Sequence, residues 1–285
     1  MQSATSVEPT RRVETPIRTD GWSWRWTGWA SWPVSPAILA VATAALALDV
    51  ASAWAAWPPW YAGRVLISPA LPLAAVLVAL VGWRRVVGDR ATRSAWREFV
   101  VGGALTALVA VLAMVHSVAG WGDMEGVTIS AVGEEVVYRL AAVLVIGAAC
   151  ARLAGREWRD TASWGTGPVI AGLVGAAGLF SVLPGHVEQM TGAENVLPFA
   201  SLAMLLGYVA FRTGSLLPGA VVHVLLDVVT LGFFAGVLSA PARAAVAAAT
   251  LTALVLGLMI AGRRLGLRRR LPAVIDLREQ PPGVA

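Results

Sequence analysis

Residues 125–150 read EGVTISAVGEEVVYRLAAVLVIGAAC, an apolar stretch that carries Glu134, Glu135 and Arg139 near its middle. Its length suits a helix that crosses the hydrocarbon core of a bilayer, which takes about 20 residues. A charged side chain at the centre of a bilayer costs about 2.5–3.5 kcal/mol on insertion scales. These three charged residues therefore need partners, a function, or both.

The composition of the 285-residue chain is that of a polytopic membrane protein. Hydrophobic residues make up 57% of it and charged residues 14%, against about 25% charged residues in soluble domains. All the basic side chains except the histidines are arginine, and alanine, valine and glycine are abundant, which indicates a bacterium with a GC-rich genome. The net charge of +5 comes from arginines at the ends of apolar runs, as in membrane loops. Because no basic face exists apart from those loops, no nucleic-acid partner is expected.

Apolar runs of about 18 residues or more predict an all-α bundle of about eight transmembrane helices. The expected spans are 35–56, 66–83, 96–119, 125–150, 167–185, 196–212, 215–238 and 242–261. We expect three parts: a Trp-rich cytoplasmic or interfacial segment at 1–34, the transmembrane bundle at 35–262, and a basic, disordered tail at 263–285.

Arginine placement predicts the orientation of the bundle. Arginines precede the first span and follow the second, fourth, sixth and eighth spans, whereas the loops on the other side are poor in arginine. Positive residues favour the cytoplasmic side of a membrane. The pattern therefore predicts an even number of spans, with both termini on the cytoplasmic side of a bacterial inner membrane.

Helical spacing divides the roles of the two glutamates. Glu135 and Arg139 are four residues apart, share a helix face and are expected to pair. Glu134 points about 100° away and stays free for another helix, a water or a metal. A free carboxylate in apolar surroundings suits a general acid or base. The alternative is an ion pair that locks two helices together.

Two further elements carry histidine. His223 and Asp227 lie four apart in a later apolar span, so they project together from one face. Such a pair is typical of a general base, an oxyanion donor or a metal ligand, and also of an interhelical hydrogen bond. His186 follows Pro184 and Gly185, which end or unwind the fifth span. Alone it would be an interface residue, but beside the other two elements it is a candidate third member.

Together these elements resemble the CPBP family of intramembrane proteases, also called the CAAX protease and bacteriocin-processing family or Abi family. Its marks are Glu-Glu-x-x-x-Arg, then Phe-x-x-x-His, and finally His-x-x-x-Asn or Asp. Residues 134–139 and 223–227 match the first and last motifs, and the similarity covers about residues 95–240. The middle motif departs, because Val182 lies four residues before His186 and Phe180 lies six before it.

The resemblance implies a metalloprotease-type hydrolase that cleaves a membrane-embedded, prenylated or leader-type peptide substrate within the bilayer. It assigns catalytic roles to Glu134, Glu135, Arg139, His186, His223 and Asp227. Glu134, helped by His186, would activate a water, and His223, oriented by Asp227, would stabilise the oxyanion. Glu134, His186 and His223 are also candidate zinc ligands with an open position, although the chain has no His-Glu-x-x-His pair.

Two other classes of protein remain compatible with the pattern. One is a catalytically silent membrane scaffold of the same fold. The other is a proton-coupled transporter, since intramembrane Glu, His and Asp also mark ion paths. The absence of a convincing internal repeat weakens the transporter interpretation. Asp49, in the first expected span, needs a partner that the sequence does not name.

Overall fold

The computed structural model describes residues 25–26, 29–55, 60–62, 65–189, 193–265 and 268–269. The chain divides into two units, Met1–Thr27 with Arg268–Ala285, and Gly28–Leu267. Within the first unit, strand β1 (Arg25–Trp26) pairs antiparallel with β4 (Arg268–Arg269). Most of the expected segment 1–34 and of the expected tail 263–285 lies outside the described residues, so both remain predictions.

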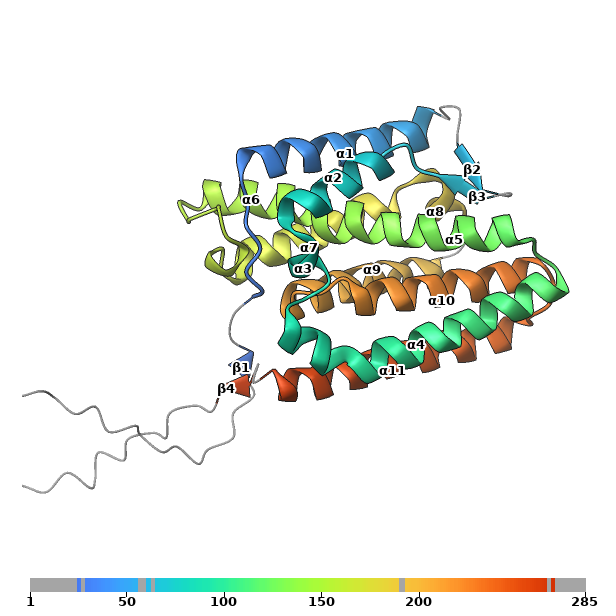
Figure 1. Cartoon of the computed structure of the whole chain (residues 1–285). Helices are drawn as coiled ribbons and strands as arrows, with labels where there is room; N and C mark the ends of the chain where they lie inside the picture. The colour runs from blue at the N-terminus through green and yellow to red at the C-terminus, as the bar shows by residue number, and fades with distance from the viewer. Residues whose placement is uncertain are drawn as a thin grey trace, which may run out of the picture. The chain divides into compact units, whose positions relative to one another are not determined.

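The second unit is helical apart from a small antiparallel ribbon of β2 (Trp60–Ala62) and β3 (Val65–Ile67). Its helices are α1 (Pro36–Ala55), α2 (Leu71–Val81), α3 (Trp83–Val86), α4 (Arg90–Ser117), α5 (Trp121–Glu134), η1 (Glu135–Ala142), α6 (Val143–Leu153), η2 (Thr161–Ser163), α7 (Thr166–Ser181), α8 (Pro184–Gln189), α9 (Ala193–Thr213), α10 (Leu217–Phe234) and α11 (Ala240–Arg264). The long helices run alongside one another (Figure 1).

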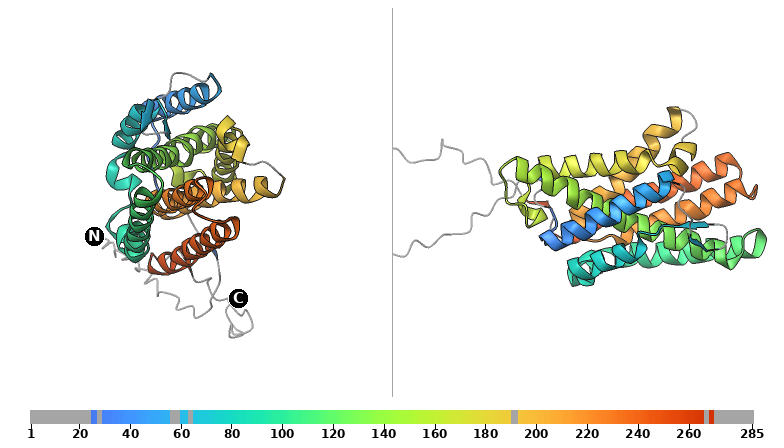
Figure 2. Two further views of the ribbon diagram at one scale, coloured as in Figure 1. Left: turned by 90° about the vertical axis from the view of Figure 1, so that its right-hand side faces the viewer. Right: turned by 90° about the horizontal axis from the view of Figure 1, so that it is seen from above.

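The segment α5–η1–α6 lies inside this bundle. On one side η1 packs against α1 and α2, and on the other side α5 packs against α10. Helix α10 in turn contacts α4 and α11, while α7 bridges α6 and α9. The left view of Figure 2 shows α1 and α11 at opposite sides of the bundle. Within the segment α5–η1–α6 the charged side chains of Asp123, Glu135 and Arg139 are buried against protein neighbours.

Among the described residues, five helices are long and apolar enough to cross a membrane. They are α1, α4, the continuous helix Trp121–Leu153, α10 and α11. Three shorter apolar helices, Leu71–Val81, Thr166–Ser181 and Phe199–Thr213, accompany them. The prediction of an all-helical integral membrane protein is confirmed, whereas eight crossings are not. The expected span 66–83 contains a helix of 11 residues, about 16 Å long, which is too short to cross a core of about 30 Å.

The expected regular helix at 125–150 contains a π-helical segment, η1, between α5 and α6. A π-helix closes i→i+5 hydrogen bonds, occurs mostly as a short segment inside an α-helix, and is frequent at functional sites. The change of helix type falls between Glu134, the last residue of α5, and Glu135, the first residue of η1. Glu134 therefore ends a regular α-helix, whereas Glu135 begins a π-helical segment, so the two glutamates do not share the single α-helix that the sequence predicts.

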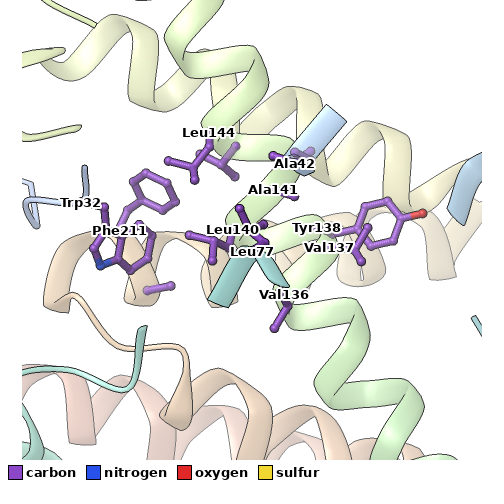
Figure 3. Close-up of a cluster of buried hydrophobic side chains, with 14 of the residues drawn as sticks. Trp32, Ala42, Leu77, Val136, Val137, Tyr138, Leu140, Ala141, Leu144 and Phe211 are labelled. Atoms are coloured by element: carbon purple, nitrogen blue, oxygen red, sulfur yellow. The ribbon is translucent and has the colours of Figure 1, made fainter. Parts of the chain in front are cut away.

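The largest buried apolar cluster surrounds η1 (Figure 3). Its side chains come from α1, α2, η1, α6, α7 and α9 and include Ala42, Leu77, Tyr138, Leu144 and Phe211. In the apolar 18-residue stretch of the helix Trp121–Leu153, 67% is buried inside the protein, against 11% in the corresponding stretch of α4. The motif-bearing helix is thus central, and α4 is peripheral.

Close packing of α6 against α7 depends on a glycine. A Cβ added to Gly172 would lie 2.9 Å from the side chain of Val143 and 3.0 Å from its carbonyl oxygen. Small residues let helix backbones approach closely in membranes. This contact fixes α7, and with it the residues that follow α7, against the helix that carries the glutamates.

Candidate active site

Glu135 is the buried member of the glutamate pair, with a side chain only 1% exposed. Its Oε1 lies 3.5 Å from Arg139 Nε and 2.9 Å from His223 Nδ1. The predicted pairing of Glu135 with Arg139 is therefore present as an ion pair. Because a carboxylate beside a guanidinium accepts hydrogen bonds, His223 donates its Nδ1 hydrogen to Glu135.

Glu134 is more accessible, with a side chain 22% exposed. Ser130, one helical turn earlier, donates a hydrogen bond of 3.1 Å to its Oε1. Its Oε2 lies 3.5 Å from His223 Nε2 and 3.8 Å from His186 Nε2. Glu134 is thus the carboxylate at which helices α5, α8 and α10 meet.

His186 stands in the short helix α8, where its ring is tied back to the end of α7. Its Nδ1 lies 2.6 Å from the carbonyl oxygen of Phe180. A carbonyl oxygen only accepts hydrogen bonds, so Nδ1 carries the hydrogen and Nε2 of the neutral ring presents a lone pair to Glu134. Burial lowers the pKa of His186, which favours this neutral form.

Asp227 takes a lesser part in holding His223 than its spacing suggests. Its Oδ2 lies 3.8 Å from His223 Nε2, beyond hydrogen-bond distance, and its side chain is 38% exposed. Glu135, at 2.9 Å from Nδ1, is the residue in hydrogen-bond contact with the imidazole. Asp227 thus lies within ion-pair distance of His223, whereas Glu135, from the neighbouring helix, makes the hydrogen bond to the ring.

Phe180 connects these groups, and its role escaped the sequence motif. Its ring centroid lies 4.1 Å from that of His186 and 6.0 Å from that of His223, and Arg139 Cζ lies 4.3 Å above it. The spacing of six residues hides this contact because α7 ends at Ser181 and α8 restarts at Pro184. The break brings His186 back over Phe180. The family motif expects a phenylalanine four residues before the histidine. Phe180, six residues before His186, takes that place because the chain turns between α7 and α8.

A glycine in α10 leaves room for the buried carboxylate. A Cβ added to Gly219 would lie 2.7 Å from Glu135 Oε2, closer than real Cβ atoms approach such an atom. Gly219 precedes His223 by one helical turn, so the same helix supplies both the imidazole and the space beside Glu135. Gly219 is therefore a structural requirement of the site that its motif spacing does not reveal.

The predicted zinc ligands converge, but too widely for a preformed metal site. Glu134 Oε2 faces the Nε2 atoms of His186 and His223 at 3.8 and 3.5 Å. Two N or O ligands of one tetrahedral zinc lie about 3.3 Å apart. Among the described residues, no group of three His, Cys, Asp or Glu side chains is placed to hold a metal ion. The donor types suit zinc, whereas their spacing would have to contract.

The six residues predicted from the sequence all lie in one cluster inside the helical bundle. Fold and site together define a membrane-embedded helical protein with a buried glutamate–histidine centre. Residues 124–229 match the Rce1-like family, described as type II CAAX prenyl endopeptidase Rce1-like. No curated protein and no solved structure gives a significant match. The matched segment, from α5 to α10, contains all six residues, and it confirms the predicted resemblance of this segment to the CAAX protease family.

Proposed function

We propose that the protein is an intramembrane endopeptidase in which Glu134 activates the hydrolytic water. The observation that carries the proposal is the meeting of Glu134 Oε2 with two imidazole Nε2 atoms, at 3.5 and 3.8 Å. Glu134 and neutral His186 present lone pairs at this point, so both can accept a hydrogen from one water. The match of residues 124–229 to a family described as CAAX prenyl endopeptidases supports the same reaction class.

In the proposed reaction, Glu134 takes a proton from the water while the water oxygen attacks the scissile carbonyl carbon. His223 acts as the imidazolium, which three carboxylates within 3.8 Å stabilise. Its Nδ1–H continues to donate a hydrogen bond to Glu135, and its Nε2–H donates a hydrogen bond to the developing oxyanion. When the tetrahedral intermediate collapses, the C–N bond breaks and Glu134 returns its proton to the leaving amine.

The proposed substrate is a peptide that reaches the site from the membrane. The centre lies in helices that are long enough to cross a bilayer and are packed inside the bundle. An apolar or lipidated peptide partitions into the bilayer and so comes close to a centre of this kind. The description of the matching family, a prenyl endopeptidase, makes a C-terminally prenylated peptide the first substrate to test.

The test compares reconstituted native protein with Glu134→Gln on quenched membrane and prenylated peptides. We expect Glu134→Gln to lower kcat by about 10²–10⁴-fold, the usual contribution of a general base. Glu125→Gln is the matched control, because Glu125 is exposed on the same helix. Native protein that cleaves none of a broad peptide panel, or a Glu134→Gln variant as fast as native, would contradict the proposal.

The same assay separates the alternatives. In the proposed reaction Glu134 activates the water without a metal, so we expect cleavage to survive dialysis against a chelator. Loss of cleavage that zinc restores would instead assign a metal to Glu134, His186 and His223. Biological activity that persists in the double variant Glu134→Ala, His223→Ala would identify a scaffold. Proton-driven flux abolished by Asp227→Asn would identify a transporter.

A further inference from the structure

Asp49 is a buried acid in α1 that the proposed reaction does not use. Its carboxylate accepts hydrogen bonds from the hydroxyl of Tyr138 in η1 and from the hydroxyl of Ser68, which follows β3. Asp49 is buried, and the ring of Tyr138 is fully enclosed. A buried carboxylate and a buried phenol each need a partner, so the two groups hold one another in place.

Tyr138 in turn packs against Phe180, which lies at the end of α7. Its ring packs edge-on against Phe180, with centroids 5.1 Å apart. Phe180 is further held by Phe199, which stacks on it with centroids 5.4 Å apart. Tyr138, Phe199 and the guanidinium of Arg139 thus enclose the Phe180 ring. The position of this ring depends on the ring of Tyr138, whose far end is fixed by Asp49.

Phe180 then sets His186 in two ways. Its carbonyl oxygen accepts the Nδ1 hydrogen at 2.6 Å, and its ring lies under the imidazole with centroids 4.1 Å apart. The hydrogen bond selects the tautomer, and the ring contact selects the tilt. Both determine whether the Nε2 lone pair points at Glu134, 3.8 Å away.

We propose that Asp49 and Tyr138 are positioning residues for His186, acting through Phe180. Neither residue touches the reacting atoms. Asp49 holds the hydroxyl of Tyr138, the Tyr138 ring holds Phe180, and Phe180 aims the imidazole at Glu134. The inference rests on the proposed function for its effect on catalysis, and on geometry alone for its effect on His186.

The test uses the small number of histidines in the chain, which is three. Histidine-selective ¹⁵N labelling of the full-length protein in micelles gives signals that single His→Gln variants assign. We expect Tyr138→Phe and Asp49→Asn to shift the ring signals of His186 and to leave those of His116 unchanged. Tyr208→Phe is the matched control, because Tyr208 packs on Trp29 in another part of the bundle.

Activity provides the second readout. A displaced imidazole should lower kcat by about 10-fold to 100-fold with KM unchanged, as expected of a misplaced catalytic group. The double variant Asp49→Asn, Tyr138→Phe should lose no more than either single variant, because the residues act in series. Additive losses would contradict a serial arrangement.

His186 signals at their native positions in both single variants would overturn the inference, even if cleavage falls. The NMR result does not depend on a substrate, so it also stands if the native protein cleaves no peptide. In that case the proposed function fails while the positioning of His186 is still decided. A folded Asp49→Asn protein suffices for the test if Tyr138→Phe does not fold.

Discussion

At His223, the two nitrogens of one imidazole face different carboxylates. Nδ1 lies 2.9 Å from Glu135 and Nε2 lies 3.5 Å from Glu134, although these glutamates are neighbours in the chain. The buried glutamate has Arg139 as its counter-charge, whereas the more exposed one has no arginine in an ion pair among the described residues. The two neighbouring glutamates therefore have different partners: Glu135 accepts the hydrogen bond from His223 Nδ1, and Glu134 faces the Nε2 atoms of His223 and His186.

A substitution at Gly219 tests whether Glu135 holds His223. We expect Gly219→Ala to push Glu135 away from His223, because the new methyl group would meet Glu135 Oε2 at 2.7 Å. The expected loss in kcat is about 10-fold to 100-fold, measured by peptide cleavage. Gly102→Ala is the matched control, since a Cβ at Gly102 meets no atom within 4 Å. Equal rates for the two variants would show that Glu135 is not held as described.

At the scale of elements, the helix breaks decide where the motif residues point. Helix α7 ends at Ser181 and α8 begins at Pro184, a residue suited to the first turn of a helix. The turn between them returns His186 over Phe180. On the other side of the centre, α5 changes to η1 immediately after Glu134. Neither break follows from hydrophobic periodicity, which cannot distinguish an α-helix from a π-helical segment.

The start of α4 provides a prediction that does not depend on catalysis. Asp89 is its N-cap and accepts a hydrogen bond of 2.7 Å from the backbone of Thr92. We expect Asp89→Ala to lower the free energy of unfolding by about 1 kcal/mol at pH 7, a typical loss for a cap. Asp89→Asn, which keeps a capping oxygen, should lose less. Thermal unfolding in detergent measures both.

The same cap should depend on pH. The backbone hydrogen bond from Thr92 lowers the pKa of Asp89 below its ordinary value of 3.8. A lowered folded-state pKa means that the stabilisation is complete above the unfolded value and disappears as the pH falls through the folded value. The difference between native protein and Asp89→Ala should therefore shrink below about pH 4. A difference that stays constant down to pH 2 would contradict an ionised cap.

At the scale of the molecule, the number of crossings decides which side the site opens to. The arginine pattern favours eight crossings and two cytoplasmic termini, whereas five described helices meet the length required of a span. An odd number of crossings would place the termini on opposite sides. Whether the three shorter apolar helices also cross the membrane therefore decides between the two arrangements.

Cysteine labelling distinguishes them, because Cys150 is the only cysteine in the sequence. In a Cys150→Ser background, we expect Gln2→Cys and Glu279→Cys to react with an impermeant maleimide only from the cytoplasmic face. Gly120→Cys, in the loop between α4 and α5, should react only from the opposite face. Termini labelled from opposite faces would establish an odd number of crossings.

Much of the site could be predicted from the sequence alone. Charged residues in an apolar helix are unfavourable in free energy, so their presence indicates partners or a function. The pairing of Glu135 with Arg139 follows from their spacing of four residues, and it is present. The convergence of Glu134, His186 and His223 was predicted by resemblance, and the structure brings them together. The role of Glu135 as the partner of His223 was not predictable, since it joins residues 88 apart.

Hydropathy and local spacing are properties of the chain, so they were enough to predict a helical membrane protein with ionisable side chains at identifiable positions. Only the tertiary structure decided which nitrogen faces which carboxylate, that Phe180 stands beside His186, and that Asp49 finds Tyr138 and Ser68. These contacts depend on the packing of α1, η1, α7 and α10 around one core. Packing between distant segments is set by shape and volume, which no local pattern encodes.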